Sequence, residues 1–150
     1  MALTLSINGE PREIEADPET PLAYVLRNEL GLKGTKIGCG LEQCGACMIL
    51  ADGAPFPSCA APAASFAGKE ITTIEGIASR PAGARVQAAF IAETAAQCGY
   101  CTAGLVVACT ALLEANPSPT EDEAKSALAP NLCRCGAHPR VLRALARAAT

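Results

Sequence analysis

The chain has 150 residues, a formal net charge of −3 and only five aromatic side chains. This length allows one ordinary domain or two small ones, and the acidic balance with few aromatic residues argues against a nucleic-acid surface. No segment approaches the roughly 20 apolar residues that cross a bilayer. The first residues also lack the basic start and apolar run of a secretory signal, so we expect a cytoplasmic protein without a transmembrane segment.

Half of the residues are hydrophobic, and 31 of them are alanine. Because alanine buries little area per residue, two small domains would be marginally stable by burial alone. We therefore expect bound cofactors and a partner surface to contribute to stability.

The first half of the chain is predicted to form strands around one helix. Asn8-Gly9 and Asp52-Gly53 are turn signals, and the strands are expected over residues 3–7, through Ile14, 48–50 and 71–74. Thr20 is a predicted N-cap, with Pro21 at the first position of a helix that runs to about Glu29.

The second half is predicted to form four short helices, over residues 86–93, 102–115, 121–128 and 139–148. Thr120 to Glu123 matches a capping box, and Pro139 suits a first helical position. Residues 78–83 have linker composition. We therefore predict two domains, residues 1–77 and 78–150.

Eight of the nine cysteines fall into two sets of four. The first set has the spacing of a plant-type [2Fe-2S] site and comprises Cys39, Cys44, Cys47 and Cys59. The second comprises Cys98, Cys101, Cys133 and Cys135. Four thiolates complete the coordination of two irons and leave no position for a substrate, so such centres transfer electrons. The predicted fold is α+β, a β-grasp plant-type ferredoxin domain followed by a four-helix [2Fe-2S]-binding bundle.

Glycines interleave with these ligands, at Gly38, Gly40, Gly45, Gly99 and Gly136. We expect them to let the backbone approach the inorganic sulfides, either because they lack a Cβ or because they reach positive φ angles.

Two alternative readings of the cysteines remain. Eight thiolates also suit two zinc sites, although the loop from Cys39 to Cys47 and the closely spaced Cys133 and Cys135 favour clusters. A disulfide framework would need an oxidising compartment. The ninth cysteine, Cys109, falls in an apolar helical stripe and is expected to be a buried small hydrophobe. His138 is expected to have a structural role.

Three arginines, Arg140, Arg143 and Arg147, share one face of the last predicted helix. They predict either a solvated stripe that complements the helix dipole or a surface for a partner.

The residues around the second set carry a family resemblance, in Gln97-Cys98-Gly99-Tyr100-Cys101 and Asn131-Leu132-Cys133-Arg134-Cys135-Gly136. With both cysteine sets, they resemble nearly end to end the small iron-sulfur subunits of the molybdenum hydroxylases, or xanthine dehydrogenase family. The chain is most similar to the small subunits of isoquinoline oxidoreductases and nicotinate dehydrogenases. Met48 and Ala103 stand where the family usually has Thr and often has Pro, and neither is a ligand.

The resemblance implies a role in a molybdenum-containing oxidoreductase, with no substrate site or catalytic residue in this chain. Two [2Fe-2S] clusters would relay electrons from a molybdopterin cofactor, in its cytosine dinucleotide form, in a large partner subunit. That subunit would hydroxylate an N-heteroaromatic ring or an aldehyde, and a flavin or cytochrome subunit would receive the electrons. The alternative function is a stand-alone ferredoxin-like carrier.

The resemblance also assigns positions to individual residues. The cluster of the second set would lie nearer the molybdopterin, and that of the first set would be the outer one. Gln97 matches a position that hydrogen-bonds the pterin, while Cys135 and Gly136 would lie close to its edge. From the residues alone, Gln97 could instead cap the C-terminus of a helix.

Overall fold

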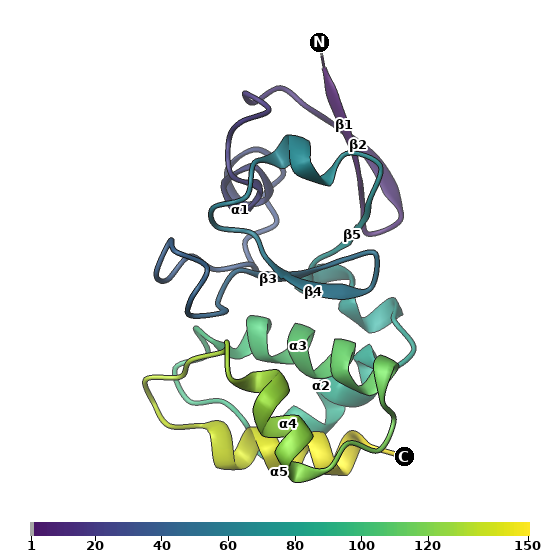
Figure 1. Ribbon diagram of the computed structural model, residues 1–150, viewed down its shortest axis with the longest axis vertical. Coiled ribbons are helices and arrows are strands. Elements are labelled where there is room, and N and C mark those ends of the chain that lie inside the picture. Colours follow the sequence, from purple (N-terminus) through teal and green to yellow (C-terminus); the bar gives the residue numbers. More distant parts are fainter. Residues whose placement is uncertain (1) are drawn as a thin grey trace.

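The computed structural model describes residues 2–150 and has two layers, a five-stranded sheet and a group of helices below it (Figure 1). The strands are β1 (Leu3–Ile7), β2 (Glu10–Ile14), β3 (Met48–Ala51), β4 (Ala54–Pro57) and β5 (Glu70–Thr72). The helices are α1 (Leu22–Tyr24), α2 (Gly83–Ala92), α3 (Thr102–Ala115), α4 (Glu121–Leu128) and α5 (His138–Ala148). A π-helical turn (Val25–Glu29) continues α1, and two 3-10 helices cover Ala63–Phe66 and Ile74–Ser79. The predicted α+β class is confirmed.

The strand order is β2-β1-β5-β3-β4, with β1 and β5 parallel and the other pairs antiparallel. Both predicted hairpin turns are present. Asn8 and Gly9 have φ angles of 54° and 81°, and Asp52 and Gly53 have 50° and 81°. Two consecutive positive φ angles define the type I′ turn, which matches the twist of the strands it joins.

Strand β3 is buried on both faces, so its residues belong to two cores. Ile49 packs with the sheet and with the helical segment after Pro21. Met48 and Leu50 point the other way, into the core of the helical layer, because neighbouring side chains on a strand face opposite sides. Met48 is therefore a packing residue between the layers.

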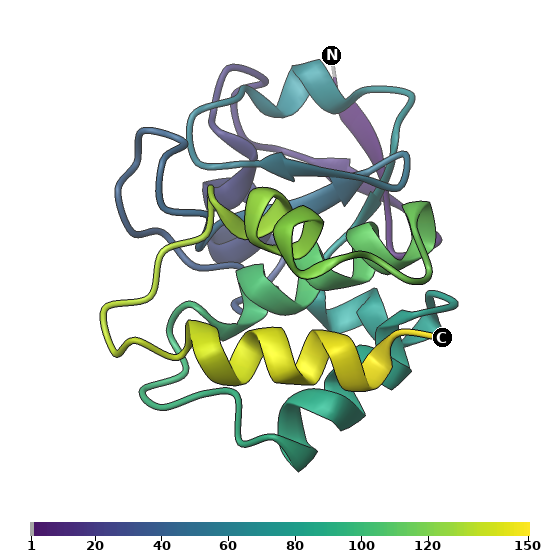
Figure 2. The ribbon, with the colours of Figure 1, turned by 60° about the horizontal axis from the view of Figure 1, so that its bottom comes forward.

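Helix α3 lies between the sheet and the other helices (Figure 2). Residues 104–111 are all buried, which explains why this helix is apolar almost all round. Its start approaches the first cysteine loop so closely that a Cβ on Gly104 would lie 2.1 Å from the Gly45 carbonyl oxygen. Within residues 2–150, no helix has both the length and the apolar character needed to cross a bilayer.

The segment between the layers is more ordered than the linker expected over residues 78–83. Ile77, in the 3-10 helix Ile74–Ser79, is fully buried in the helical core, and α2 already begins at Gly83. A Cβ on Gly83 would lie 1.7 Å from the Ile77 carbonyl oxygen, so this connection is closely packed. The boundary between residues 77 and 78 stays a prediction.

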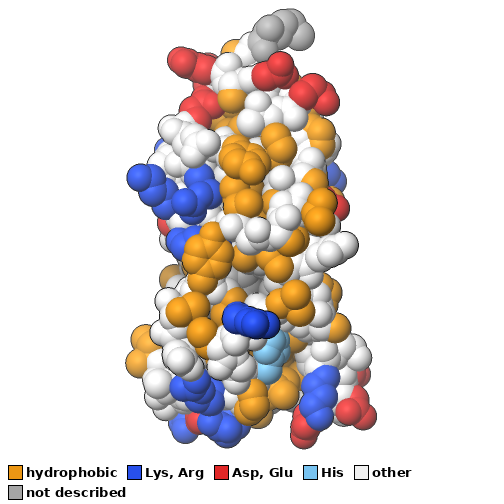
Figure 3. All heavy atoms as spheres, turned by 90° about the vertical axis from the view of Figure 1, so that its left-hand side faces the viewer, with side chains coloured by type: hydrophobic (Ala, Val, Ile, Leu, Met, Phe, Trp, Pro, Cys, Tyr) orange, Lys and Arg blue, Asp and Glu red, His pale blue; other side chains and the backbone are white. Residues whose placement is uncertain are grey.

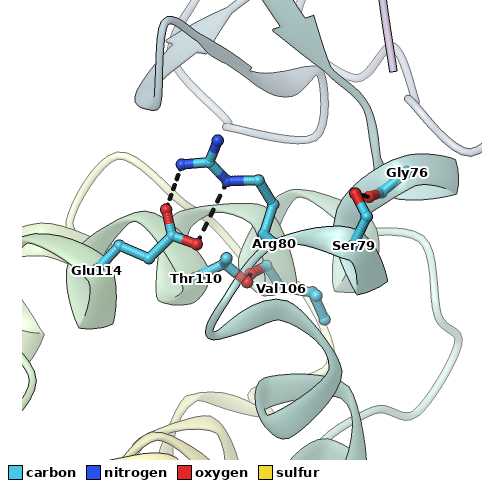
Figure 4. A network of polar contacts seen from close by, with 6 residues as sticks. All are labelled: Gly76, Ser79, Arg80, Val106, Thr110 and Glu114. Atoms are coloured by element: carbon cyan, nitrogen blue, oxygen red, sulfur yellow. Dashed lines mark hydrogen bonds and ion pairs between the residues drawn. The ribbon is translucent and has the colours of Figure 1, made fainter. Parts of the chain in front are cut away.

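An ion pair fastens this connection to α3 (Figure 4). The Arg80 guanidinium forms two contacts with the Glu114 carboxylate, one of them 3.3 Å from Nε to Oε1. Both side chains are largely shielded from solvent. A bidentate pair of this kind fixes the relative orientation of the two side chains as well as attracting them.

The capping predictions had different outcomes. The box at α4 is confirmed, because the Glu123 N–H donates to Thr120 Oγ1 at 3.2 Å and the Thr120 N–H donates to the Glu123 carboxylate at 2.7 Å. The predicted Thr20 cap is wrong, since Pro21 precedes the first helical residue and no side chain caps the helix. The Leu22 N–H instead donates to the Ala61 carbonyl oxygen at 3.0 Å.

Two of the three arginines on α5 pair with Glu93, the C-cap residue of α2. Arg147 Nε lies 2.7 Å from one carboxylate oxygen and Arg143 Nε lies 3.4 Å from the other. These contacts tie α5 to the end of α2, a link that neither reading of the arginine stripe included.

The Glu93 pair predicts a pH-dependent stability. Hydrogen bonding and charge from Arg147, and then from Arg143, lower the pKa of Glu93 from its usual 4.5. Because the folded-state pKa lies below the unfolded one, the stabilisation is present above pH 4.5 and is lost as the pH falls through the folded-state value. We expect Glu93→Gln to lower the thermal midpoint at pH 7, and its difference from the wild type to shrink below pH 4.5.

The control is Glu19→Gln, which removes an exposed carboxylate with no ion pair among residues 2–150. Comparing midpoints at each pH cancels acid effects common to all three proteins. A Glu93→Gln difference that stayed constant with pH would contradict the ion-pair contribution.

Candidate metal centres

The thiols of the first cysteine set lie in adjacent pairs. The Cys39 and Cys44 side chains lie close enough to affect one another, and so do those of Cys47 and Cys59. Cys59 also lies within electrostatic reach of Cys39, so the two pairs are neighbours. None of the nine cysteines forms a disulfide. Two adjacent pairs of free thiols are the donor set that a [2Fe-2S] cluster takes.

Backbone N–H groups point at all four of these sulfurs. The donors are Leu41 and Gln43 to Cys39 (both 3.2 Å), Cys39 to Cys44 (3.4 Å), Ser58 to Cys47 (3.3 Å) and Glu42 to Cys59 (3.3 Å). Hydrogen bonds from Leu41 and Gln43 lower the pKa of Cys39 to about 7, because they stabilise negative charge on sulfur. Burial raises the pKa of Cys59 to about 11. The loop therefore stabilises the negatively charged form of the Cys39 sulfur.

Positive φ angles shape this loop. Gly40, Glu42 and Gly45 have φ angles of 68°, 59° and 77°, so the expectation is confirmed for the two glycines, while Glu42 gave no sequence signal. Gly38 meets the other part of the expectation, the need for a residue without a Cβ. Its φ is not positive, but a Cβ there would lie 2.8 Å from Cys44 Sγ.

The second set is assembled from the turn before α3 and the loop between α4 and α5. The Cys101 and Cys133 side chains lie close enough to affect one another, and Cys98 lies within electrostatic range of Cys101. Burial raises the pKa of Cys101 to about 12. Burial also acts on Cys133, but hydrogen bonds, first that of the Ala137 N–H at 3.4 Å, hold its pKa below the usual 9.0. Cys135, the remaining member, is half-buried.

The expected positive φ angles are confirmed at this site too, with 84° for Gly99 and 72° for Gly136. Gln97 is exposed and lies four residues beyond Glu93, which ends α2, so the helix-cap alternative for Gln97 is wrong. Cys98 and Gly136 are exposed as well. These residues therefore form an accessible edge at the second site.

The two sets adjoin one another. A cavity of about 210 Å³ is lined by Cys44 of the first set and Cys98, Cys101 and Cys133 of the second, together with Gly38, Ala46, Tyr100, Leu132 and Arg134. Across it, the Leu132 N–H donates to the Cys44 carbonyl oxygen at 2.8 Å. Both ligand loops lie on the left in Figure 1, and Figure 3 shows that this face is rich in apolar side chains with scattered cations.

The structural expectations for the two remaining residues are confirmed. His138 Nε2 lies 2.7 Å from the Asn131 carbonyl oxygen, which fixes the loop that carries Cys133 and Cys135. Cys109 is fully buried in the helical core, and burial raises its pKa to about 12, so it stays a neutral thiol.

The donor sets fit two iron-sulfur clusters. The first set supplies two interacting pairs of thiols, and the second supplies the interacting Cys101 and Cys133 with Cys98 nearby. Both come from glycine-rich loops with backbone N–H groups directed at sulfur, which is the environment such clusters require. When bound, each cluster supplies one-electron chemistry.

Comparison with known proteins agrees with this geometry. A family of 2Fe-2S iron-sulfur cluster binding domains matches residues 5–71, and a family of [2Fe-2S] binding domains matches residues 73–146. Both families bind [2Fe-2S] clusters, which decides against the zinc reading.

Individual relatives cover nearly the whole chain. One of the subunits of nicotinate dehydrogenase from Pseudomonas putida is 50% identical over 147 residues, which are 98% of this chain and 94% of that one. The alpha chain of isoquinoline 1-oxidoreductase from Brevundimonas diminuta is 42% identical over 144 residues, 95% of this chain and 94% of that one.

A solved structure shows the same fold. The crystal structure of quinoline 2-oxidoreductase from Pseudomonas putida 86 superposes with a TM-score of 0.90 at 40% identity, over 99% of this chain and 93% of that chain. This chain therefore belongs to the molybdenum hydroxylase, or xanthine dehydrogenase, family, as one of its small subunits that carry two [2Fe-2S] clusters and transfer electrons.

Proposed function

We propose that this subunit carries electrons from a molybdopterin cofactor in a large partner subunit to an external acceptor, and that the partner hydroxylates an N-heteroaromatic ring. The names of the relatives support this substrate class, because nicotinate, isoquinoline and quinoline all contain such a ring. An aldehyde is the other candidate substrate, because an aldehyde oxidoreductase from Desulfovibrio desulfuricans shares the fold at 35% identity over 98% of this chain, which corresponds to 17% of that one.

The observation that carries the proposal is the cavity that joins the two cysteine sets, lined by Cys44 of the first set and by Cys98, Cys101 and Cys133 of the second. Cys39, Cys44, Cys47 and Cys59 hold the outer cluster, and Cys98, Cys101, Cys133 and Cys135 hold the inner one. The polypeptide supplies the sulfur ligands, points N–H groups at them and shields them from water.

The partner covers the accessible edge of the second site. Gln97 is exposed there. By the family resemblance, its amide hydrogen-bonds the pterin, and Cys135 and Gly136 lie close to the pterin edge. Tyr100 and Leu132 beside it are 49% and 59% exposed, which is apolar area that a partner would bury.

The finer assignments follow from the same family. The cofactor has the cytosine dinucleotide form, a flavin or cytochrome subunit receives the electrons near the first site, and the complex is assembled in the cytoplasm. We propose residues 1–77 and 78–150 as the two domains.

Metal analysis with EPR on the dithionite-reduced complex tests the function. We expect the chain to purify with a larger, molybdenum-containing partner and to hold about four irons, two for each four-cysteine set. Two distinct signals of reduced clusters should appear. Zinc in place of iron, or a stable chain that purifies alone, would contradict the proposal.

A further inference from the structure

Tyr100 stands between two ligands of the second set, and its hydroxyl reaches the first set. The hydroxyl donates to the Ile37 carbonyl oxygen at 2.6 Å, across 63 positions of sequence. Ile37 lies two residues before Cys39. This single side-chain contact therefore joins the two ligand loops.

The other ligand loop of the second set is held by different contacts. The Leu132 N–H donates to the Cys44 carbonyl oxygen, and Asn131 Nδ2 donates to the Gly45 carbonyl oxygen at 3.4 Å. Both of these bonds fasten the loop that carries Cys133. Among residues 2–150, the Tyr100 hydroxyl makes the only hydrogen bond from the 98–101 turn to the first cysteine loop.

The 98–101 turn needs such a tie. In this chain Cys98, Gly99 and Tyr100 are all exposed, and Gly99 has a φ of 84°, which glycine adopts without strain. A turn with so few buried contacts within its own chain reorients at low cost. The Tyr100 ring also lines the cavity between the two sets, so its position affects the space between the centres.

We propose that Tyr100 is a positioning residue whose hydroxyl fixes the separation and relative orientation of the two clusters. The proposal rests on the proposed function, because this separation matters only if electrons pass between the centres. Electron transfer slows steeply as two centres move apart, so a loosened turn lowers the transfer rate even when both clusters are present.

The test is Tyr100→Phe in the assembled complex, with Tyr24→Phe as the matched control. Tyr24 is the only other tyrosine, is similarly exposed at 40%, and its hydroxyl has no hydrogen bond within residues 2–150. A typical hydrogen bond changes an equilibrium about fivefold, so orientations of the turn that lack the contact with Ile37 should become about fivefold more populated in Tyr100→Phe.

Two measurements report the changed orientation of the 98–101 turn. The splitting that each reduced cluster imposes on the EPR signal of the other should weaken and broaden in Tyr100→Phe, and electron transfer between the clusters in a single turnover should slow. Iron content should stay unchanged, and Tyr24→Phe should match the wild type in all three measurements.

The outcomes separate the inference from the function. An unchanged splitting and rate in Tyr100→Phe would overturn the positioning role and leave the electron-transfer function standing. Loss of half the iron would overturn it too, by assigning Tyr100 to cluster retention. Absence of both cluster signals in the wild type would overturn the function itself, and the inference with it.

Discussion

The variants Cys47→Ala and Cys133→Ala should each remove one of the two EPR signals and leave the other. Cys47 pairs with Cys59 in the first set and Cys133 pairs with Cys101 in the second, so each change removes a ligand from one cluster only. Iron should fall from about four to about two per chain. Turnover of the complex with its external acceptor should fall to background, because electrons must pass through both clusters in turn and loss of either one interrupts the path.

Cys109→Ala is the matched control for these two variants. This cysteine is fully buried but belongs to neither set, so its replacement should lower stability slightly and retain all the iron. If Cys47→Ala removed both signals, or neither, the division of the ligands into two independent sets would be contradicted.

Gly45→Ala should destabilise the protein far more than Gly68→Ala, although the two glycines have almost the same backbone conformation. Their φ angles are 77° and 76°, so both variants incur a left-handed strain of about 1–2 kcal/mol. A Cβ at position 68 meets nothing within 4 Å, whereas at position 45 it would lie 2.5 Å from Asn131 Nδ2 and 2.7 Å from the Pro130 carbonyl oxygen. Overpacking of this kind adds about 1–3 kcal/mol.

Denaturant unfolding of both variants and the wild type measures the difference. Because Asn131 belongs to the second ligand loop, the extra loss in Gly45→Ala reports on the contact between the two ligand loops. Equal losses in the two variants would show that this contact contributes nothing to stability.

Local features of the fold could be predicted from the sequence because their partners lie within a few residues. Asn8-Gly9 sets its own turn, and the capping box joins Thr120 to Glu123. The cysteine spacing was informative for another reason, since the cluster itself limits which thiols can share it. The glycines beside the ligands followed from the same requirement.

The contacts that the sequence did not reveal connect distant segments. Glu93 meets arginines at least 50 positions away, and the start of α1 is satisfied by the Ala61 carbonyl oxygen instead of the expected Thr20 cap. Hydrophobic periodicity identifies the face that an element buries, but it does not identify the element that covers this face. The tie from Tyr100 to Ile37 belongs to this class, because it exists only once the two layers have docked.

Because β3 packs into two cores, the chain cannot be cut between its two layers without exposing apolar side chains. A fragment that ends at residue 77 would keep Ile49 in its own core but expose Met48 and Leu50 to water, along a strip that α3 normally covers. Modules exchanged between relatives should therefore be moved as matched pairs, with the strand and its covering helix taken from the same parent. A chimera joined only at residue 77 would leave the apolar face of β3 without its matching helix and would favour aggregation.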